Sequence, residues 1–352
     1  MNARIVLLPG DGIGPEVVDA AAAVLQRVAE HGGHTFVFTE HLIGGAALEA
    51  GRPALPPETL GAAQQADAVL LGAVGSPAFD HLPPSERPES GLLALRRGLG
   101  VFANLRPARA WKGLEGASPL RANVLHGTDL VVVRELAGGL YYGEPRGLSA
   151  DGRSAVNTMA YSCDEVARIA RVAFDLAKSR RRSVVSVDKA NVLEVSRLWR
   201  DVVIEVSRDY PDVTLAHEYV DAAAMKLALT PAAFDVILTE NMFGDILSDE
   251  AGAICGSLGL LPSASLGPGP GLFEPVHGSA PTLAGRDIAN PIGAILSGAM
   301  LLADGLGLRD EAQAITDAVE CAIARGMRTA DLTVSDASAG TTEMTRAILS
   351  EL

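Results

Sequence analysis

Cysteine is scarce in this 352-residue chain, and negative charge outweighs positive charge. The three cysteines, Cys163, Cys255 and Cys321, are far apart, so the sequence contains neither a disulfide framework nor a CxxC metal site and suits a reducing compartment. A formal net charge of −14 argues against nucleic acid as a partner, because nucleic acid phosphates require a basic surface.

Long hydrophobic runs are missing as well. The longest apolar stretch, Gly293–Ala303, is too short to cross a bilayer. Residues Arg4–Leu8 are expected to form a buried strand, and no secretory signal is visible before them. We therefore expect a cytoplasmic protein with no membrane partner.

The sequence does contain a regular alternation of strand and helix patterns. Thr35–Thr39 and Ala68–Val74 are predicted strands with helical stretches between them, which is typical of an α/β fold with helices covering a sheet. Apolar residues make up 48% of the chain and charged residues 20%, which predicts a globular protein. The length exceeds what one hydrophobic core usually serves, so we expect two domains.

A glycine-rich turn follows the first predicted strand. Gly10, Gly12 and Gly14 have the spacing G-x-G-x-G, and Pro15 then begins a helix, whereas the dinucleotide fingerprint requires G-x-G-x-x-G. We interpret this turn as structural. The fold is therefore not expected to be a standard Rossmann domain, and a cofactor should bind elsewhere.

Two acidic residues, Asp245 and Asp249, follow the predicted strand Val236–Leu238. They are four apart, so on a helix their carboxylates lie on one face, and oxygen ligands of this kind suit Mg²⁺ or Mn²⁺. The simpler alternative is that acids in a first helical turn interact with the helix dipole. These residues alone leave both interpretations open.

Other charged residues lie at or near the predicted ends of elements. Arg96, Arg106 and Arg134 suit an anionic ligand, because a guanidinium binds a carboxylate through two hydrogen bonds, although each could be a surface residue. Lys189 follows a predicted strand, where parallel sheets place ligands, or it is a surface lysine. Asp221 follows another predicted strand and is a third candidate carboxylate.

The segment from Glu274 to Pro281 combines His277 with glycine and serine. Its backbone amides could hold a phosphate, with His277 near an adenine. A plain turn is the alternative.

Six motifs, in order over almost the whole chain, together resemble one known family. They are VLLPGDGIGPEV (Val6–Val17), FANLRPA (Phe102–Ala108), VRELAGGLYYGEPRG (Val133–Gly147), VDKANVL (Val187–Leu193), FGDILSD (Phe243–Asp249) and FEPVHGSAP (Phe273–Pro281). The chain is similar to the metal-dependent β-hydroxyacid oxidative decarboxylases, the isocitrate/isopropylmalate dehydrogenase family. Among its branches, the match is best to the one that acts on 3-isopropylmalate in leucine biosynthesis.

The resemblance implies an open mixed sheet flanked by helices, divided between two domains. The first domain, which binds the cofactor, would be formed by residues 1–101 and 256–352, and the second by residues 102–255. The resemblance also implies a homodimer with shared active sites, in which residues 144–161 form an arm at the interface.

The resemblance assigns chemistry to individual residues. The substrate would be a dicarboxylate that is oxidised at C2, with hydride transfer to NAD, and then decarboxylated. Lys189 would be the base, acting through water, and Tyr141 would protonate the enol. The ligands of Mg²⁺ or Mn²⁺ would be Asp221, Asp245 and Asp249, with Asp221 and Lys189 contributed by the partner subunit. Arg96, Arg106 and Arg134 would bind the carboxylates, and Asp221 would also contact the substrate.

Specificity is expected to depend on leucines. Ser90 and Leu92 stand where isocitrate-specific relatives carry Ser-x-Asn, and Leu93 adds another apolar side chain. An unpaired carboxylate against leucines is unfavourable, which predicts that isocitrate is rejected. A methylene is worth only about 1–3 kcal/mol, so other short alkylmalates are expected to be accepted. Glu89 matches the residue that couples this pocket to the nicotinamide.

The resemblance also implies a cofactor site. Its residues would be Glu274, His277, Gly278, Ser279, Ala280, Thr282 and Asn290. Thr282 departs from the family pattern, because NAD-dependent members carry aspartate there to bind the adenosine ribose. The Lys-Tyr pair of NADP-dependent members is also absent, since Leu283 follows Thr282, so we expect NAD.

Several alternatives stay open. Paralogous D-malate or tartrate dehydrogenases typically carry Glu-Asn-Thr-Glu-Gly where this chain has Glu135–Gly139, which disfavours them, and a homoisocitrate dehydrogenase is a further paralogue. Phosphoryl transfer would need a Gly-Lys-Ser/Thr element that the sequence lacks. A homologue that only binds ligands is the remote alternative.

Overall fold

The computed structural model of the protein describes residues 1–333 and 338–352. The chain divides into two compact units. Unit 1 contains Met1–Val101, Trp111–Pro119 and Gly256–Leu352, and unit 2 contains Phe102–Ala110 and Leu120–Cys255. The segment Trp111–Pro119 groups with unit 1, outside the boundary predicted for that domain, and in unit 1 the carbonyl of Gly113 accepts a hydrogen bond from Arg328.

The sheet strands of unit 1 follow the order β2-β1-β3-β12-β11. Their bounds are β1 (Asn2–Gly10), β2 (Thr35–Glu40), β3 (Ala68–Ala73), β11 (Pro262–Leu266) and β12 (Gly271–Pro275). Neighbouring strands are parallel except for β11 and β12, which are antiparallel. Every residue of β3 is buried, which explains its continuous apolar sequence.

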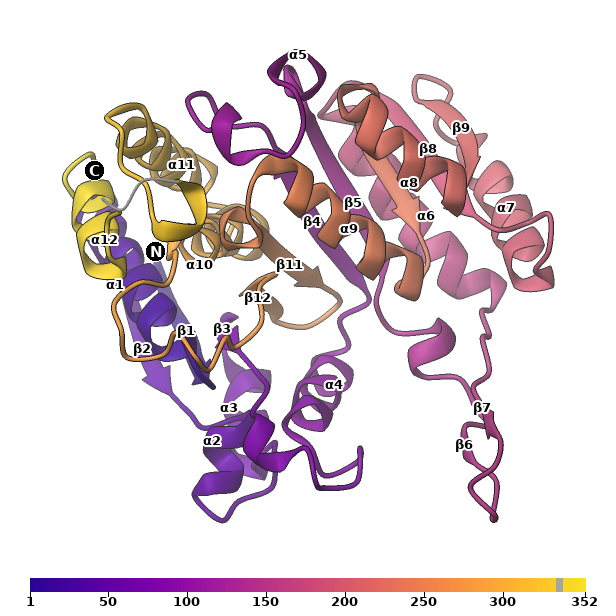
Figure 1. Ribbon diagram of the computed structural model, residues 1–352, viewed down its shortest axis with the longest axis horizontal. Helices are drawn as coiled ribbons and strands as arrows, with labels where there is room; N and C mark the ends of the chain where they lie inside the picture. Colours follow the sequence, from indigo (N-terminus) through magenta and orange to yellow (C-terminus); the bar gives the residue numbers. More distant parts are fainter. Residues whose placement is uncertain (334–337) are drawn as a thin grey trace. The chain divides into compact units, whose positions relative to one another are not determined.

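The helices of unit 1 form two groups (Figure 1). The first group contains α1 (Gly14–Gly32), α10 (Ile292–Met300), α11 (Arg309–Ala324) and α12 (Thr341–Leu349), and the second contains α2 (Gly44–Glu49), α3 (Pro57–Gln65) and α4 (Pro88–Leu99). As predicted, α1 has a proline at its start, and it ends at Gly33, whose φ of 66° suits glycine.

The sheet strands of unit 2 follow the order β4-β5-β10-β8-β9. Their bounds are β4 (Ala103–Arg109), β5 (Asp129–Glu135), β8 (Ser183–Asp188), β9 (Thr214–Tyr219) and β10 (Val236–Thr239). β4 and β5 are antiparallel, and the other neighbours are parallel. Both units therefore contain mixed pairing flanked by helices, which confirms the predicted fold class.

The longer helices of unit 2 pack in two pairs. The first pair is α6 (Cys163–Lys178) with α7 (Glu194–Ser207), and the second is α8 (Val220–Leu229) with α9 (Asn241–Cys255); α5 (Ala122–Leu125) is a single turn. Val220 belongs to α8 and not to the strand before it, so Asp221 lies in the first turn of a helix. β9, α8, β10 and α9 follow one another in the sequence and bring Asp221, Asp245 and Asp249 into the second helix pair.

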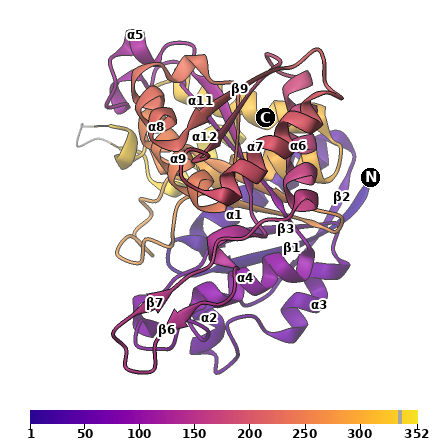
Figure 2. The ribbon, with the colours of Figure 1, turned by 90° about the vertical axis from the view of Figure 1, so that its right-hand side faces the viewer.

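A small hairpin interrupts unit 2 within the predicted arm. Its strands are β6 (Gly147–Leu148) and β7 (Ala155–Val156), and all four residues are exposed. Figures 1 and 2 show the hairpin extending away from the rest of unit 2.

Short helical turns complete the chain. They are η1 (Pro77–Phe79), η2 (Glu115–Ala117), η3 (Gly139–Tyr141), η4 (Pro231–Ala233), η5 (Leu258–Leu260), η6 (Leu301–Gly305) and η7 (Ala330–Leu332). Within residues 1–333 and 338–352, no helix is both long enough and apolar enough to cross a membrane.

Candidate active site

The predicted acidic pair lies among predicted arginines in unit 2. Arg106, on β4, places Nη1 at 3.3 Å from Asp245 Oδ1 and 3.4 Å from Asp249 Oδ1, and its Nε donates to Asn104 at 2.7 Å. Arg134, on β5, forms an ion pair with Asp245. The antiparallel pairing of β4 with β5 places Arg106 and Arg134 on neighbouring strands, and α9 presents the acids to them.

Tyr141 completes this cluster. Its hydroxyl donates to Asp245 Oδ2 at 2.8 Å, and the Arg134 guanidinium lies 5.6 Å from the centre of its ring. Burial, with the hydrogen bond to Asp245, raises the pKa of Tyr141 to about 12. The hydroxyl therefore keeps its proton at neutral pH and can act as a proton donor.

The residue at which α9 begins excludes an interaction with the helix dipole as the explanation of the acidic pair. The helix begins at Asn241, so Asp245 and Asp249 lie in its second and third turns, beyond the first-turn amides that a dipole argument requires. Burial raises the pKa of Asp249, with a smaller contribution from the charge of Asp245. The two carboxylates share one face, as their spacing predicts.

Lys189 and Asp221 form a second cluster in unit 2. Lys189 follows β8, and its ammonium pairs with the Asp221 carboxylate at the start of α8. The hydrogen bond from Lys189 lowers the pKa of Asp221, and the Asp221 side chain is 67% exposed. Asp188 supports the turn beneath Lys189, because it accepts two hydrogen bonds of 2.9 Å from Arg200 and one from Ala190 N.

The three predicted metal ligands do not meet in one chain. Within residues 1–333 and 338–352, no group of three or more His, Cys, Asp or Glu side chains could hold a metal ion. Asp245 and Asp249 converge on Arg106, whereas Asp221 is paired with Lys189. Within the described part of this chain, the three predicted metal ligands therefore fall into two separate clusters.

The remaining predicted substrate residues lie in unit 1, on α4. Glu89, Leu92, Leu93 and Arg96 follow the spacing of one helical face. Arg96 Nη2 lies 2.7 Å from Glu274 Oε1, and both side chains are largely buried, with 12% and 8% exposed. The ion pair thus joins a predicted substrate residue to a predicted cofactor residue on β12.

The N-terminal glycine turn organises loops of unit 1 through Asp11. This buried carboxylate accepts hydrogen bonds from the backbone amides of Gly45, Ala46 and Gly75 at 2.7–2.9 Å. The amide of Ile13 donates to the carbonyl of Ser279 at 2.8 Å. These contacts hold the predicted cofactor segment, and they agree with a structural role for the turn.

The predicted adenosine residues surround buried polar atoms of unit 1. Burial lowers the pKa of His277, whose Nδ1 contacts the carbonyl of Gly278 at 3.0 Å. Among the described residues, His277 Nε2 is buried and has no hydrogen-bond partner. Ser279 is buried, Ala280 adopts a φ of 38°, and Thr282 is exposed.

Asp331 is a candidate cofactor residue that the motifs did not reveal. Its Oδ2 accepts from Asn290 Nδ2 at 3.0 Å, and its charge acts on His277. Asp331 therefore supplies an acidic side chain near His277, although position 282, where NAD-dependent relatives carry aspartate, is threonine. Asp331 lies 41 residues from Asn290, so local spacing gives no signal for the contact.

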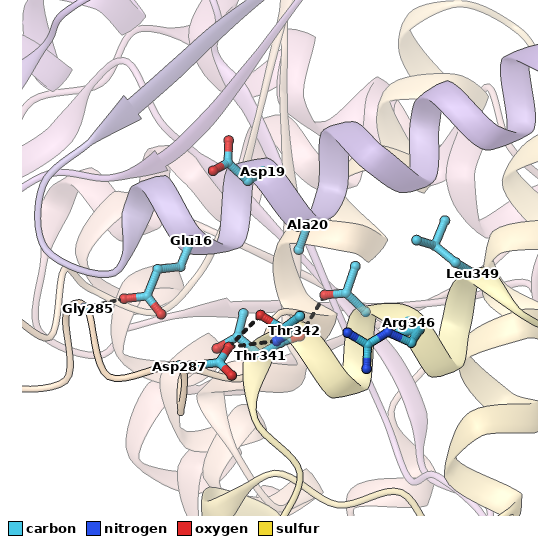
Figure 3. A pocket seen from close by; sticks show the side chains of 10 residues that line it. Glu16, Asp19, Ala20, Gly285, Asp287, Thr341, Thr342, Arg346 and Leu349 are labelled. Atoms are coloured by element: carbon cyan, nitrogen blue, oxygen red, sulfur yellow. Dashed lines mark hydrogen bonds between the residues drawn. The ribbon is translucent and has the colours of Figure 1, made fainter.

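A cavity of about 570 Å³ lies elsewhere in unit 1 (Figure 3). Its lining consists of Glu16, Asp19, Ala20, Gly285, Asp287, Thr341, Thr342, Thr345, Arg346 and Leu349. Two of its three acids are bound to backbone, because Glu16 accepts from Gly285 N and Asp287 accepts from Thr342 N. The cavity contains none of the predicted site residues.

Comparisons with known proteins agree with the motifs. The family model described as isocitrate/isopropylmalate dehydrogenase matches residues 4–348. A relative named 3-isopropylmalate dehydrogenase from Anaeromyxobacter dehalogenans is 57% identical over 335 residues, which are 94% of this chain and 95% of the relative. A relative of the same name from Shouchella clausii is 54% identical over 358 residues, covering 100% of this chain and 98% of the relative.

A solved structure shows the same fold. The crystal structure of isocitrate dehydrogenase from Methylococcus capsulatus has a TM-score of 0.88 and 34% identity, and the match covers 99% of each chain. The predicted family resemblance is confirmed. This chain belongs to the isocitrate/isopropylmalate dehydrogenase family.

Proposed function

We propose that this enzyme oxidises and decarboxylates 3-isopropylmalate to 4-methyl-2-oxopentanoate in leucine biosynthesis, with NAD as the hydride acceptor. The observation that carries the proposal is the convergence of Arg106, Arg134 and Tyr141 on Asp245. Relatives named 3-isopropylmalate dehydrogenase that are 54–59% identical over at least 94% of this chain support the choice of substrate.

Arg106 and Arg134 bind the substrate carboxylates. Both guanidiniums are nearly buried, so little side-chain freedom is lost when a dicarboxylate binds. Arg96 on α4 is the third carboxylate ligand, and Glu274 orients it. Leu92 and Leu93 on the same helix contact the isopropyl group, and their apolar surface disfavours the additional carboxylate of isocitrate.

Two residues move protons. Lys189 accepts the proton of the C2 hydroxyl through a water molecule as hydride leaves C2. Loss of carbon dioxide then leaves an enolate, which becomes the enol by taking back the proton held on Lys189. Tyr141 donates its proton to the carbon that carried the carboxylate, Lys189 accepts the enol hydroxyl proton as the ketone forms, and Tyr141 regains a proton from solvent. The Tyr141 hydroxyl is protonated at neutral pH and lies beside Arg134, which binds a substrate carboxylate.

A divalent cation fits between Asp245 and Asp249. Both carboxylates reach the same nitrogen of Arg106, so their oxygens already converge on a common point. Mg²⁺ or Mn²⁺ prefers such oxygen ligands, and Asp221 is the third ligand. A bound ion would supply positive charge next to the negative charge that develops on the hydroxyl oxygen of the substrate.

The cofactor segment fits an adenosine. The buried Nε2 of His277 is a polar atom in need of a partner, and Ser279 and Asn290 are also buried. The carboxylate of Asp331 would repel the 2′-phosphate of NADP, which supports NAD although Thr282 replaces the family aspartate. NAD supplies the hydride acceptor for the oxidation.

We also propose that the enzyme is a homodimer. Met225 and Leu229 on α8 and Ile246 on α9 are 56%, 61% and 57% exposed, and the two helices pack against each other. Leu148 and Val156 on the β6–β7 hairpin are also exposed, at 75% and 50%. Covering α8 and α9 with a second chain buries this apolar surface next to Asp221 and Asp245 and lets the partner subunit complete the site.

The test is an assay of NADH formation with a panel of 3-isopropylmalate, isocitrate, homoisocitrate, D-malate and tartrate. We expect the highest kcat/KM with 3-isopropylmalate and NAD, loss of activity with a chelator, and recovery with Mg²⁺ or Mn²⁺. A higher kcat/KM with another acid, or with NADP, would show that the proposed substrate or cofactor is wrong.

A further inference from the structure

Asn241 is a buried residue that touches several parts of the candidate site without belonging to the residues predicted for it. It is the first residue of α9 and has an exposed fraction of 0%. Its Oδ1 accepts hydrogen bonds from Arg134 Nε at 2.9 Å and Nη2 at 2.7 Å. Its Nδ2 donates to the carbonyls of Leu136 at 3.2 Å and Gly138 at 3.0 Å.

The acceptor side of this amide orients Arg134. Two guanidinium nitrogens on one edge bind Asn241, and Nη1 then lies against Asp245. A guanidinium is planar, so fixing one edge also fixes the direction of the other nitrogens. Gly244, one turn along α9, leaves room for this arrangement, because a Cβ at that position would lie 2.7 Å from Arg134 Cγ.

The donor side of the amide holds the turn that carries Tyr141. Leu136 and Gly138 lie between β5 and η3, and Tyr141 is the last residue of η3. Tyr161 adds a further link, because its hydroxyl accepts from the backbone amide of Asn241 at 3.1 Å. One buried side chain is therefore hydrogen-bonded both to Arg134 and to the turn that leads to Tyr141, and Arg134 and Tyr141 are two of the three groups that converge on Asp245.

Asparagine suits this position because it offers an acceptor and donors at once. Aspartate keeps acceptors for Arg134 but has no donor for the two carbonyls. Alanine removes both sets of hydrogen bonds and leaves buried polar groups of Arg134 without this partner.

We propose that Asn241 is a positioning residue that orients Arg134 for the substrate carboxylate and Tyr141 for proton donation. The catalytic role of Asn241 rests on the proposed function. Its effect on the orientation of Arg134 can be measured without substrate.

The first experiment is a double-mutant cycle of Asn241→Ala with Arg134→Lys, read as kcat/KM for 3-isopropylmalate. Asn241→Ala is expected to lower kcat/KM by about 10- to 100-fold, through both a higher KM for the acid and a lower kcat, with the KM for NAD unchanged. In the Arg134→Lys background the increase in KM is expected to disappear, because the ammonium cannot make the paired contacts, whereas the fall in kcat that comes from the turn carrying Tyr141 remains. Equal losses in both backgrounds would show that Asn241 acts on the fold and not through Arg134.

The second experiment measures Arg134 directly, by NMR of the enzyme labelled with ¹⁵N-arginine. The Nε–H signal of Arg134, assigned from its loss in Arg134→Lys, is expected to be protected from solvent exchange in the wild type and in Asn241→Asp. Protection is expected to be lost in Asn241→Ala, and an unchanged signal there would overturn the proposal. Asn123→Asp, at an exposed position on α5, is the matched control.

Asn241→Asp also separates the two contacts of the amide. It is expected to keep the KM for the acid near the wild-type value and to lower kcat, because only the turn that carries Tyr141 loses its donors. If the wild type oxidises none of the acids in the panel, the proposed function fails, and the NMR result still decides whether Asn241 orients Arg134.

Discussion

The cluster around Asp245 and the Lys189–Asp221 pair contain the same kinds of charge. They differ in how deeply the side chains are buried and in how many other side chains hold them. Arg106 and Arg134 have side chains that are 9% and 2% exposed, and other side chains hold each guanidinium from behind. The Lys189 and Asp221 side chains are 27% and 67% exposed. The first cluster is preorganised within one chain, whereas an exposed pair such as the second is usually worth little.

This difference indicates how the site is divided. Residues that bind the substrate carboxylates need a fixed geometry, and burial supplies it. Asp221 lies at the start of α8, the helix that carries the exposed Met225 and Leu229, and it is paired with Lys189 after β8. We propose that this pair acts on a site in a second chain. The following predictions test this division, beginning with the largest effect.

The largest effect is expected from removing one member of each cluster. Lys189→Ala and Asp245→Asn should each lower kcat by about 10²- to 10⁴-fold, because the first loses a base and the second a ligand of the cation and a partner of Tyr141. If Lys189 acts across the dimer, co-expression of the two variants produces mixed dimers with one intact site. Mixed dimers purified through their two tags should then have about half of wild-type activity, because one of their two sites is intact.

The control for this experiment is co-expression of Lys189→Ala with Lys189→Ala carrying a different tag, which should remain inactive. No recovery in the mixture of the two different variants would place Lys189 and Asp245 in the same chain's site. The measurement is NADH formation by purified mixed dimers that carry both tags.

A smaller effect is expected from adding a methyl group at Gly244, where α9 approaches Arg134. Gly244→Ala would place a Cβ 2.7 Å from Arg134 Cγ and 2.8 Å from its Cβ, so the arginine must shift. A displacement of this kind should lower kcat/KM by up to about 100-fold, mostly through the KM for the acid. Steady-state kinetics measure the effect.

Gly61→Ala on α3 is the matched control. Among the described residues, nothing lies within 4 Å of the Cβ that it would add. It should leave the kinetics unchanged and raise the free energy of unfolding by about 0.5–1 kcal/mol, because alanine favours a helix. Equal kinetics for Gly244→Ala and the wild type would contradict the fixed orientation of Arg134.

Local sequence patterns predicted much of this arrangement. The spacing of Asp245 and Asp249 indicated a shared helical face, and both carboxylates do approach one nitrogen of Arg106. The strand before the glycine turn and the helix after it also lie where the pattern predicted them. These features depend on periodicities of a few residues, which are visible in any stretch of sequence.

Contacts between distant residues could not be predicted in this way. Asn241 lies just before the predicted acidic pair, and no local pattern indicates that it binds Arg134, which is 107 residues away. Asp11 lies in the glycine turn, and its hydrogen bonds to the start of α2 and to Gly75, 34 and 64 residues away, could not be inferred. Hydrogen bonds of buried side chains depend on the tertiary fold, and one sequence does not reveal which pairs form.

The exposed surface of the second helix pair allows a test of the dimer. Leu229→Glu should weaken the dimer by about 1–3 kcal/mol, because it places a charge where the interface is apolar. Activity should then fall on dilution, and sedimentation should show monomers at concentrations where the wild type is a dimer. Val37→Glu on β2, where the side chain is 50% exposed, should change neither property.

The smallest effect concerns pH, because the pKa of a buried carboxylate at the start of α9 and the pKa of the exposed Asp221 shift in opposite directions. Burial raises the pKa of Glu240, which accepts hydrogen bonds from the first amides of α9, above its ordinary value of 4.5, whereas Lys189 lowers the pKa of Asp221. A raised pKa means that the folded protein holds the proton more tightly than the unfolded chain. The stability that Glu240 contributes is therefore fully present below about pH 4.5 and is lost as the pH rises through its folded pKa.

Glu240→Gln removes this titration and leaves the others in place. The melting temperature of the wild type minus that of Glu240→Gln should therefore decrease from pH 4 to pH 8, by about 2–4 °C for each kcal/mol of stability. For Asp221→Asn the corresponding difference should rise above the ordinary Asp pKa of 3.8 and be much smaller, because solvent screens the exposed pair. Thermal melts at several pH values measure both differences. The melting-temperature difference for Glu240→Gln could instead be the same at every pH. That result would mean that the Glu240 carboxylate is as well solvated in the folded protein as in the unfolded chain. The contrast between a buried cluster and an exposed pair would then not extend to the start of α9.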